Sequence, residues 1–265
     1  MGKTKIEWCD HTINPIVGCS KCSSGCENCY AEKMAFRLSK NPLTAKKYAG
    51  VVDEHGKWTG KVSGLDLAVF DKLPKVPSRV FVGSMCDVFH NSTPASWLFK
   101  LSKQFEKYPQ HTFILLTKRP ENAKWWFDQP VSGRHPNLWL GVTVCNQQEA
   151  DEKIPALLDI PAALRFISFE PLLGPVSLWR WFPEGSCQKP SNYKGRRFIK
   201  NTEYENGIHW VICGAETGPH KGNMNPEWAI ALRNQCKDAD VPFFFKKDSK
   251  GKEFLDGEIV RQFPD

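Results

Sequence analysis

Four cysteines stand close together near the start of the sequence. Cys19, Cys22, Cys26 and Cys29 fall within the stretch GCSKCSSGCENCYAE. Thiols grouped in this way can form disulfides, hold a zinc ion or carry an iron–sulfur cluster. The sequence opens MGKTKIEWCD, without the apolar segment of a secretory signal. We therefore expect a reducing cytoplasmic environment, in which disulfides are improbable.

The spacing of the cysteines bears on the two remaining metal chemistries. Structural zinc sites usually set two CxxC pairs about 12–20 residues apart. Here only three residues separate Cys22 from Cys26. Iron–sulfur sequences of the ferredoxin kind combine spacings of two and three residues, as this one does. The spacing favours a cluster, with zinc or unliganded redox-active thiols as the alternatives.

Two overlapping triads of these cysteines could ligate a cubane cluster. Cys22, Cys26 and Cys29 spell CxxxCxxC, whereas Cys19, Cys26 and Cys29 spell CxxxxxxCxxC. Either triad leaves one iron of a cubane without a protein ligand. An open iron is a place where a substrate or cofactor can bind.

Apolar runs that alternate with helical patterns indicate how this loop is positioned. We expect buried strands at residues 13–17, 79–84, 112–117, 138–144, 164–169 and 209–214, with a possible seventh at 242–246. Helical patterns lie between them, at 30–39, 94–107, 121–128, 146–158 and 226–239. Thr93-Pro94 and Asn225-Pro226 each place a capping residue before a proline at the first helical position. The alternation predicts an α/β fold with parallel strands, as an open sheet or a barrel.

Polar side chains follow four of the predicted strands at the point where each strand ends. The carboxyl ends of parallel strands are where chemistry collects in such folds, so we expect these side chains to share one rim with the cysteine loop. They are Ser84, Asp87, His90, Thr117, Lys118, Arg119, Glu170, Glu216 and His220. Ordinary structural roles are the alternative, because loops are polar and strands end in caps and turns.

Length and composition predict one domain over residues 1–265. The chain is 41% hydrophobic, which is enough for a full core, and the segments 44–61 and 183–207 look like polar insertions around a cluster loop at 18–30. No apolar run approaches the roughly 18 residues that cross a bilayer. A net charge of +7 is compatible with a nucleic acid or nucleotide and does not require one. The scattered thiols should be small core residues; they are Cys86, Cys145, Cys187, Cys213 and Cys236.

Nearly the whole chain resembles one branch of the radical S-adenosylmethionine (radical SAM) superfamily, found in phages and bacteria and often encoded beside a three-Cys-motif partner protein. The matching stretches are TKIEW, NPIVGC, GCENCYAE, RVFVGSMCDVFH, LLTKRP, LWLGVTV, RFISFEPLLGP, WVICGAETGP, PEWAIALRNQC and VPFFFK. The family pattern keeps the cysteines at positions 19, 26 and 29, and Cys22 and Cys9 are additions in this sequence. The resemblance therefore implies Cys19, Cys26 and Cys29 as the cluster ligands, with Cys22 as the alternative to Cys19.

The resemblance also implies a fold and an activity. The fold would be a partial (βα)₆ TIM-like barrel of parallel strands. The activity would be reductive cleavage of S-adenosylmethionine at a [4Fe-4S] cluster, giving a 5′-deoxyadenosyl radical that abstracts hydrogen from a substrate. Such an enzyme needs an electron donor. Together with the net charge, the Lys118-Arg119 pair and the basic tail around Lys246 favour a nucleic acid or nucleotide as the substrate to be modified or repaired.

Roles at the rim follow from the chemistry of that cofactor. Its ammonium and ribose hydroxyls need acceptors, and its carboxylate or a substrate phosphate needs donors. The candidate cofactor-binding residues are Ser84, Asp87, Thr117, Lys118, Glu170 and Glu216, with Arg119 as a second donor. Three other functions remain open: a zinc-stapled nucleic-acid-binding module, a peptide-modifying radical SAM enzyme, and an interaction protein that works only with its neighbour-encoded partner.

Overall fold

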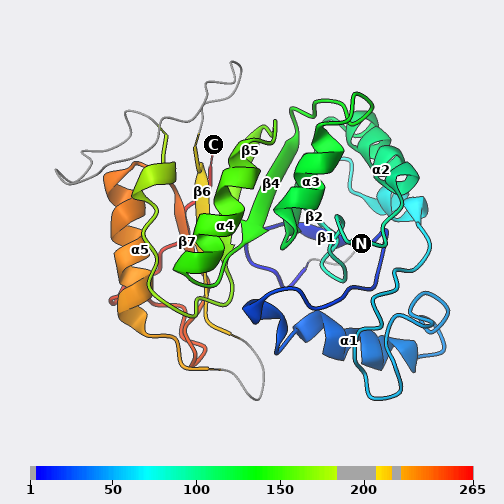
Figure 1. Ribbon diagram of the computed structural model, residues 1–265, viewed down its shortest axis with the longest axis horizontal. Coiled ribbons are helices and arrows are strands. Elements are labelled where there is room, and N and C mark those ends of the chain that lie inside the picture. Colours follow the sequence, from blue (N-terminus) through cyan, green and yellow to red (C-terminus); the bar gives the residue numbers. More distant parts are fainter. Residues whose placement is uncertain (1–3, 184–206, 217–221, 265) are drawn as a thin grey trace.

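An open, curled sheet of seven parallel strands forms the centre of the structure, a computed structural model that describes residues 4–183, 207–216 and 222–264 (Figure 1). The strands lie side by side in chain order, and each pairs in parallel with the next. They are β1 (His11–Ile13), β2 (Arg79–Val82), β3 (Thr112–Thr117), β4 (Leu138–Thr143), β5 (Leu164–Phe169), β6 (Trp210–Cys213) and β7 (Phe243–Phe245). This confirms the parallel α/β class, including the possible seventh strand.

Helices cover the outer face of the sheet and one of its ends. Four of them, α2 (Ala95–Lys107), α3 (Pro120–Phe127), α4 (Gln147–Leu158) and α5 (Pro226–Asp238), lie along the outer face (Figure 1). The first helix, α1 (Tyr30–Ser39), lies instead at the carboxyl ends of the strands, after the short 3₁₀ turn η1 (Ser24–Cys26). Two further 3₁₀ segments are η2 (Leu67–Lys72) and η3 (Trp179–Trp181), of which η3 is the one helical turn described between β5 and β6.

The strands are buried on both faces, as their continuous apolar runs predict. All six residues of β5 are buried. Alternate residues face the helices in the main core, while the inner face carries a layer of aromatic side chains: Trp8, Phe81, Phe166, Trp210 and Phe244. Gly141 makes room for this layer, because a β-carbon there would lie 2.4 Å from the Phe166 ring. The aromatic layer fills the curled sheet near the amino ends of its strands and leaves the carboxyl ends free for a site.

Several predicted boundaries differ from the structure by one or two residues, and those of the first strand and the start of α2 differ for identifiable local reasons. The first strand occupies residues 11–13 and not 13–17, because Pro15 has no N–H to continue the pairing with β2. Helix α2 begins at Ala95, since Pro94 has an extended ψ of 139° and is itself the N-cap; the Thr93 hydroxyl is buried without a hydrogen-bond partner in the described part of the chain. The other proline start is confirmed, because the Asn225 side chain accepts a hydrogen bond from the Glu227 N–H.

The first polar insertion has a small core of its own. Tyr48 and Val51 pack against Ala31 and Ala35 of α1, and the backbone N–H of Trp58 donates to the buried carboxylate of Glu32 at 3.0 Å. The insertion therefore supports α1 at the end of the sheet. The second insertion, 183–207, falls almost wholly outside the described residues.

The scattered cysteines mostly pack as the sequence predicts. Cys145, Cys213 and Cys236 are fully buried, and burial raises the pKa of each thiol, that of Cys145 to about 11. Cys86 is half-buried, and Cys187 lies outside the described residues. Among the described residues, none of the helices has the length and apolar character needed to cross a membrane.

Candidate functional site

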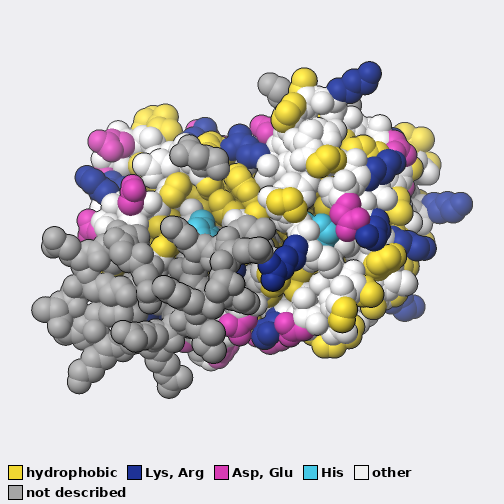
Figure 2. All heavy atoms as spheres, turned by 90° about the horizontal axis from the view of Figure 1, so that it is seen from above, with side chains coloured by type: hydrophobic (Ala, Val, Ile, Leu, Met, Phe, Trp, Pro, Cys, Tyr) yellow, Lys and Arg dark blue, Asp and Glu magenta, His cyan; other side chains and the backbone are white. Residues whose placement is uncertain are grey.

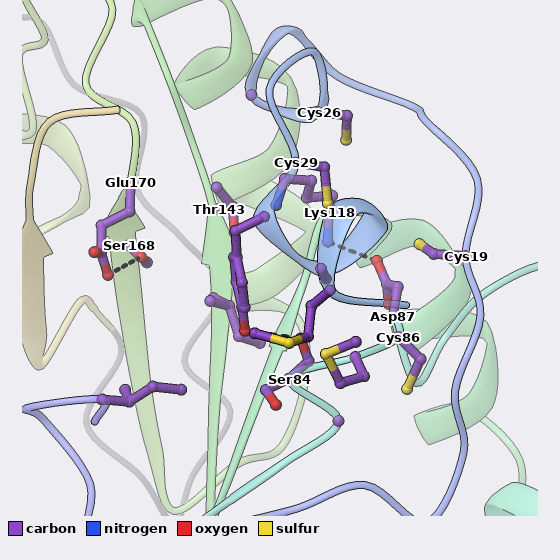
Figure 3. A pocket seen from close by; sticks show the side chains of 18 of the residues that line it. Cys19, Cys26, Cys29, Ser84, Cys86, Asp87, Lys118, Thr143, Ser168 and Glu170 are labelled. Atoms are coloured by element: carbon purple, nitrogen blue, oxygen red, sulfur yellow. Dashed lines mark hydrogen bonds between the residues drawn. The ribbon is translucent and has the colours of Figure 1, made fainter. Parts of the chain in front are cut away.

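A cavity of about 660 Å³ opens at the carboxyl ends of the strands (Figure 3). Its wall brings together residues from the cysteine loop and from the ends of β2 to β7. The predicted site residues that line it are Cys19, Cys26, Cys29, Ser84, Asp87, Thr117, Lys118, Arg119, Glu170 and Glu216. Cys22 and His90 are not part of the wall, and His220 lies outside the described residues.

The three cysteines of the family pattern stand on one side of this cavity. Cys19 follows Gly18 after β1, Cys26 ends η1, and Cys29 is the N-cap of α1. Figure 3 shows them around the same side, with Ser168 and Glu170 on the opposite side and Thr143 between. No three His, Cys, Asp or Glu side chains among the described residues are close enough together to hold a single metal ion. The thiols therefore share a wall without converging on one point.

Cys22 differs from the other three in its surroundings. Its side chain is exposed, whereas Cys19 and Cys29 are half-buried and Cys26 is buried. Its thiol nevertheless lies close enough to lower the pKa of the Cys26 thiol, an effect that Lys118 reinforces. Cys22 thus lies close to one predicted ligand but outside the cavity wall.

Two glycines allow the cysteine loop to pack closely against the rest of the chain. Gly18 has a φ of +105°, and a β-carbon there would lie 2.2 Å from the Lys61 carbonyl oxygen. At Gly25 a β-carbon would lie 2.7 Å from Cys145 Sγ and 3.1 Å from Pro171 Cδ. Neither position leaves space for a side chain, so the two GC pairs of the sequence mark where the loop touches its support.

Both carboxylate oxygens of Asp87 accept hydrogen bonds from other residues of the protein. Its Oδ1 accepts hydrogen bonds from Thr117 Oγ1 at 2.7 Å and from the Phe89 N–H at 3.1 Å. Its Oδ2 accepts from the Lys118 N–H at 2.9 Å and from Arg119 Nη1 at 3.2 Å. Thr117 is likewise occupied, since its hydroxyl also accepts from the Arg119 N–H. These contacts make Asp87 and Thr117 supports of the wall.

Arg119 connects the end of β3 to the cysteine loop. Its side chain is buried beside Asp87 and forms an ion pair with it. Arg119 Nη2 donates to the backbone oxygen and to Oγ of Ser20, both at 2.9 Å, and Nη1 donates to Cys19 Sγ at 3.9 Å. The Ser20 hydroxyl lies 2.7 Å from His90 Nε2, which explains how His90 supports the wall from behind it.

Glu149 holds the other half of the loop and escaped the sequence analysis. Its Oε1 accepts from Ser24 Oγ at 2.7 Å and from the Ser24 N–H at 3.3 Å, and its Oε2 accepts from Lys153 Nζ at 2.8 Å. Asn146 and Glu149 have the spacing of a helix capping box, and Asn146 does cap α4. That local role conceals the contact of Glu149 with a loop 125 residues away.

Glu170 forms an ion pair across the far wall. Its Oε1 lies 2.7 Å from Lys246 Nζ, and its Oε2 accepts from the Trp8 indole at 3.3 Å and from Ser168 Oγ at 3.4 Å. The negative charge of Glu170 raises the pKa of Lys246 despite its burial. The ion-pair partner of Glu170 is therefore Lys246. The sequence placed Lys246 in a basic tail, although its position directly after β7 puts it at the same rim.

Hydrogen-bonding groups on three neighbouring strands form a row across the cavity. Thr143 of β4 pairs in register with Ser168 of β5, and Lys118 directly follows Thr117, which pairs with Val142. The Lys118 ammonium has no hydrogen bond or ion pair to any described residue, and within the same part of the chain Thr143 Oγ1 is buried without a partner. Burial lowers the pKa of Lys118, but the charges of Cys26 and Asp87 outweigh it and raise the pKa overall. The row offers donors to an anion.

The remaining predicted residues tie the cavity mouth together. Asn28 Nδ2 donates to Glu216 Oε1 at 2.9 Å, so the cysteine loop contacts the segment after β6. Ser84 Oγ donates to Asn14 Oδ1 at 3.2 Å, and Tyr30 donates to the Ser84 carbonyl oxygen at 2.9 Å. Two of these contacts join the loop or α1 to the segments after β6 and β2, and the Ser84–Asn14 contact joins the segments after β2 and β1.

Comparison with known proteins gives one family and no activity. The family model described as "Protein of unknown function (DUF5131)" matches residues 3–258. No curated protein and no solved structure matches the chain.

Proposed function

The chain belongs to the DUF5131 family, and from that premise we propose that it is a radical SAM enzyme whose [4Fe-4S] cluster is held by Cys19, Cys26 and Cys29. One observation carries the proposal. These three cysteines, separated from each other by loop and turn, line one cavity together with polar residues from the ends of six strands of a parallel sheet. A cofactor that needs thiolates and polar contacts in the same space fits this wall.

The three thiols that line the cavity supply the number of protein ligands that the proposed cluster needs. A tetrahedral zinc ion requires its ligands to converge, each about 2.3 Å from the metal. A cubane attaches each cysteine to a different iron, so its ligands surround the group without meeting at one point. Cys29 also caps α1, whose N-terminal end carries partial positive charge that favours an anionic cluster.

The residues of the opposite wall would bind S-adenosylmethionine. When bound, the cluster supplies the single electron that cleaves the sulfonium of this cofactor. Glu170 and Glu216 present carboxylate oxygens to its ammonium and ribose hydroxyls, while Lys118 and Thr143 present donors to its carboxylate. The aromatic layer beneath them excludes water from that side of the cavity. In this proposal the sheet is a partial (βα)₆ TIM-like barrel, which its order and parallel pairing support.

For the substrate we favour a nucleotide or nucleic acid. Lys5, Lys21 and Lys247 stand on the cavity wall beside Lys118 and Arg119, so cations gather around the mouth. On the described part of the opposite end of the sheet, basic side chains are interspersed with acidic ones (Figure 2). The mouth is thus the better docking place for a phosphate. The reaction also needs an electron donor, for which a reducing cytoplasm is the setting we propose, and it can involve a partner protein.

Purification without oxygen tests the cluster directly. We expect brown protein with about four iron atoms per chain. After addition of a strong one-electron reductant, it should slowly convert S-adenosylmethionine to 5′-deoxyadenosine even without a substrate, as measured by liquid chromatography. Cys26→Ala and Cys29→Ala should abolish both properties, because both candidate triads need these thiolates.

Two results would replace the proposal with one of the alternatives. Colourless protein with one zinc ion per chain would indicate the zinc-stapled binding module. A full cluster that fails to bind S-adenosylmethionine would indicate a protein that transfers electrons or acts only through a partner.

A further inference from the structure

Arg119 makes more contacts with the cysteine loop than any role in the wall alone requires. It donates two hydrogen bonds to Ser20, one to Cys19 Sγ and one to Asp87. The guanidinium and the Asp87 carboxylate are about nine-tenths buried, with exposed side-chain fractions of 10% and 7%. A planar guanidinium offers its donors in a fixed geometry, so these contacts fix both the position and the direction of the Cys19–Ser20 segment.

Asp87 in turn is held from three further sides, by Thr117, Lys118 and Phe89. Arg119 therefore rests on a carboxylate that cannot turn away from it. The loop is anchored to β3 through this pair, 99 residues along the chain from Ser20. This anchor therefore fixes the position of Cys19 at the cavity.

Cys22 is the obvious competitor for the same cluster position. Its thiol lies close to Cys26, and with Cys26 and Cys29 it forms the alternative triad CxxxCxxC. What distinguishes the two thiols is their direction: Cys19 lines the cavity, while Cys22 is exposed and outside the wall. Among the described residues of the loop, Arg119 donates hydrogen bonds to Cys19 and Ser20.

We propose that Arg119 is a positioning residue that selects Cys19 over Cys22 as the first cluster ligand, by bonding the Cys19–Ser20 segment to the end of β3. This inference rests on the proposed function. Without Arg119 the segment before Cys26 is free to shift, and Cys22 then supplies the third thiolate. The selection depends on geometry as well as charge, because a lysine at position 119 cannot reach Asp87 and both oxygens of Ser20 at once.

The test compares the cysteine requirement in two backgrounds, with iron content and the electron paramagnetic resonance spectrum of the reduced cluster as readouts. With Arg119 present, Cys22→Ala should keep the cluster and Cys19→Ala should lose it. In Arg119→Gln the requirement should reverse, so that adding Cys22→Ala removes the iron and adding Cys19→Ala does not. The spectrum of Arg119→Gln alone should differ from that of the parent chain. Retention of the Cys19 requirement in Arg119→Gln, or loss of iron in Cys22→Ala alone, would overturn the inference.

A second readout needs no cluster and separates this inference from the proposed function. In metal-free protein, iodoacetamide should alkylate exposed Cys22 faster than Cys19, as followed by peptide mass spectrometry. Arg119→Gln should raise the Cys19 rate several-fold towards that of Cys22, and an unchanged Cys19 rate would reject the anchor even if the chain bound no iron.

Folding controls accompany both readouts. Arg79→Gln removes the other Arg–Asp pair at a strand end, with Asp10 at the far end of β2, and should change neither readout. If Arg119→Gln does not fold by circular dichroism, Arg119→Lys keeps the charge beside Asp87 and should still raise the Cys19 rate and the Cys22 requirement.

Discussion

At position 25 a side chain as small as a methyl group would collide with its surroundings. The hypothetical β-carbon lies 2.7 Å from Cys145 Sγ and 3.1 Å from Pro171 Cδ, both outside the cysteine loop. Cys145 is fully buried and Pro171 is cyclic, so neither group can move far. The glycine before Cys26 is therefore a packing requirement of the loop.

Gly25→Ala should consequently destabilise the protein by about 2 kcal/mol in urea unfolding, the usual cost of overpacking. It should also lower the iron content, because the displaced loop carries Cys26. Removing the obstacle should restore part of both. The loss of stability caused by Gly25→Ala should therefore be smaller in a Cys145→Ala background than in the parent chain.

Gly64→Ala is the matched control. No atom stands within 4 Å of a β-carbon at Gly64, and its φ is not in the left-handed region. This variant should be neutral or slightly stabilising. Equal losses at positions 25 and 64 would contradict the packing argument.

Among the elements, the connection from α3 to β4 depends on a buried histidine. His135 Nε2 lies 2.7 Å from Ser102 Oγ of α2 and 3.0 Å from the Ser132 carbonyl oxygen, and the ring packs edge-on against Phe105. Desolvation lowers the pKa of His135, and it also lowers the pKa values of His90 and His111. The folded protein therefore holds these imidazoles in their neutral form.

The lowered pKa values of these histidines determine how the stability of the protein depends on pH. The unfolded chain protonates its histidines near their ordinary pKa of about 6.5, while the folded chain does so only at lower pH. Between these values the unfolded state binds more protons, so the free energy of unfolding should fall as the pH drops below about 6.5. His135→Gln should be less stable by about 1 kcal/mol at pH 7.5 through the lost hydrogen bond, yet should lose less stability on acidification. Urea titrations at pH 7.5 and 5.5 measure both quantities, and parallel losses in the two proteins would rule out His135 as a contributor.

The elements were predictable where one stretch of sequence determines them. The strands followed from continuous apolar runs, and the site rim from the polar residues Ser84, Lys118 and Glu170 that come directly after three of them. Predictions failed or stayed incomplete where a distant segment decides the outcome. Arg119 was predicted only as a donor at the rim because its partners Ser20 and Asp87 are far away in sequence, and Glu149 was not predicted because its partner Ser24 is also distant. Contacts of this kind depend on how the strands stack, which local patterns do not encode.

At the scale of the whole molecule, positive charge is concentrated at the mouth of the cavity. Lys5 and Lys21 are exposed there, and Lys247 is half-buried beside them. The parent chain should bind a short single-stranded DNA or RNA in fluorescence anisotropy, with an affinity that falls steeply as salt rises, because phosphate contacts release counterions. Changing all three lysines to glutamine should weaken binding and reduce the logarithmic salt slope by about one unit per lost contact.

Lys75, Lys100 and Lys237 provide the matched control. They are equally basic and exposed but stand outside the cavity wall, so their triple glutamine variant has the same net charge as the rim variant. It should retain most of the affinity and slope. Equal effects of the two variants would show attraction by net charge alone, and no binding to either polymer at low salt would leave free nucleotides or peptides as substrates.

The order of the sheet has a consequence for how the protein is made. Each strand pairs with the one synthesised just before it, so the sheet can assemble progressively as the chain leaves the ribosome. The cysteine loop emerges with the first strand, but Arg119 follows Ser20 by 99 residues, Glu149 follows Ser24 by 125, and Glu170 follows Trp8 by 162. During that interval the thiols are present without their supports. Any metal that they are to hold in the final geometry must therefore be loaded late, after translation has passed the middle of the chain.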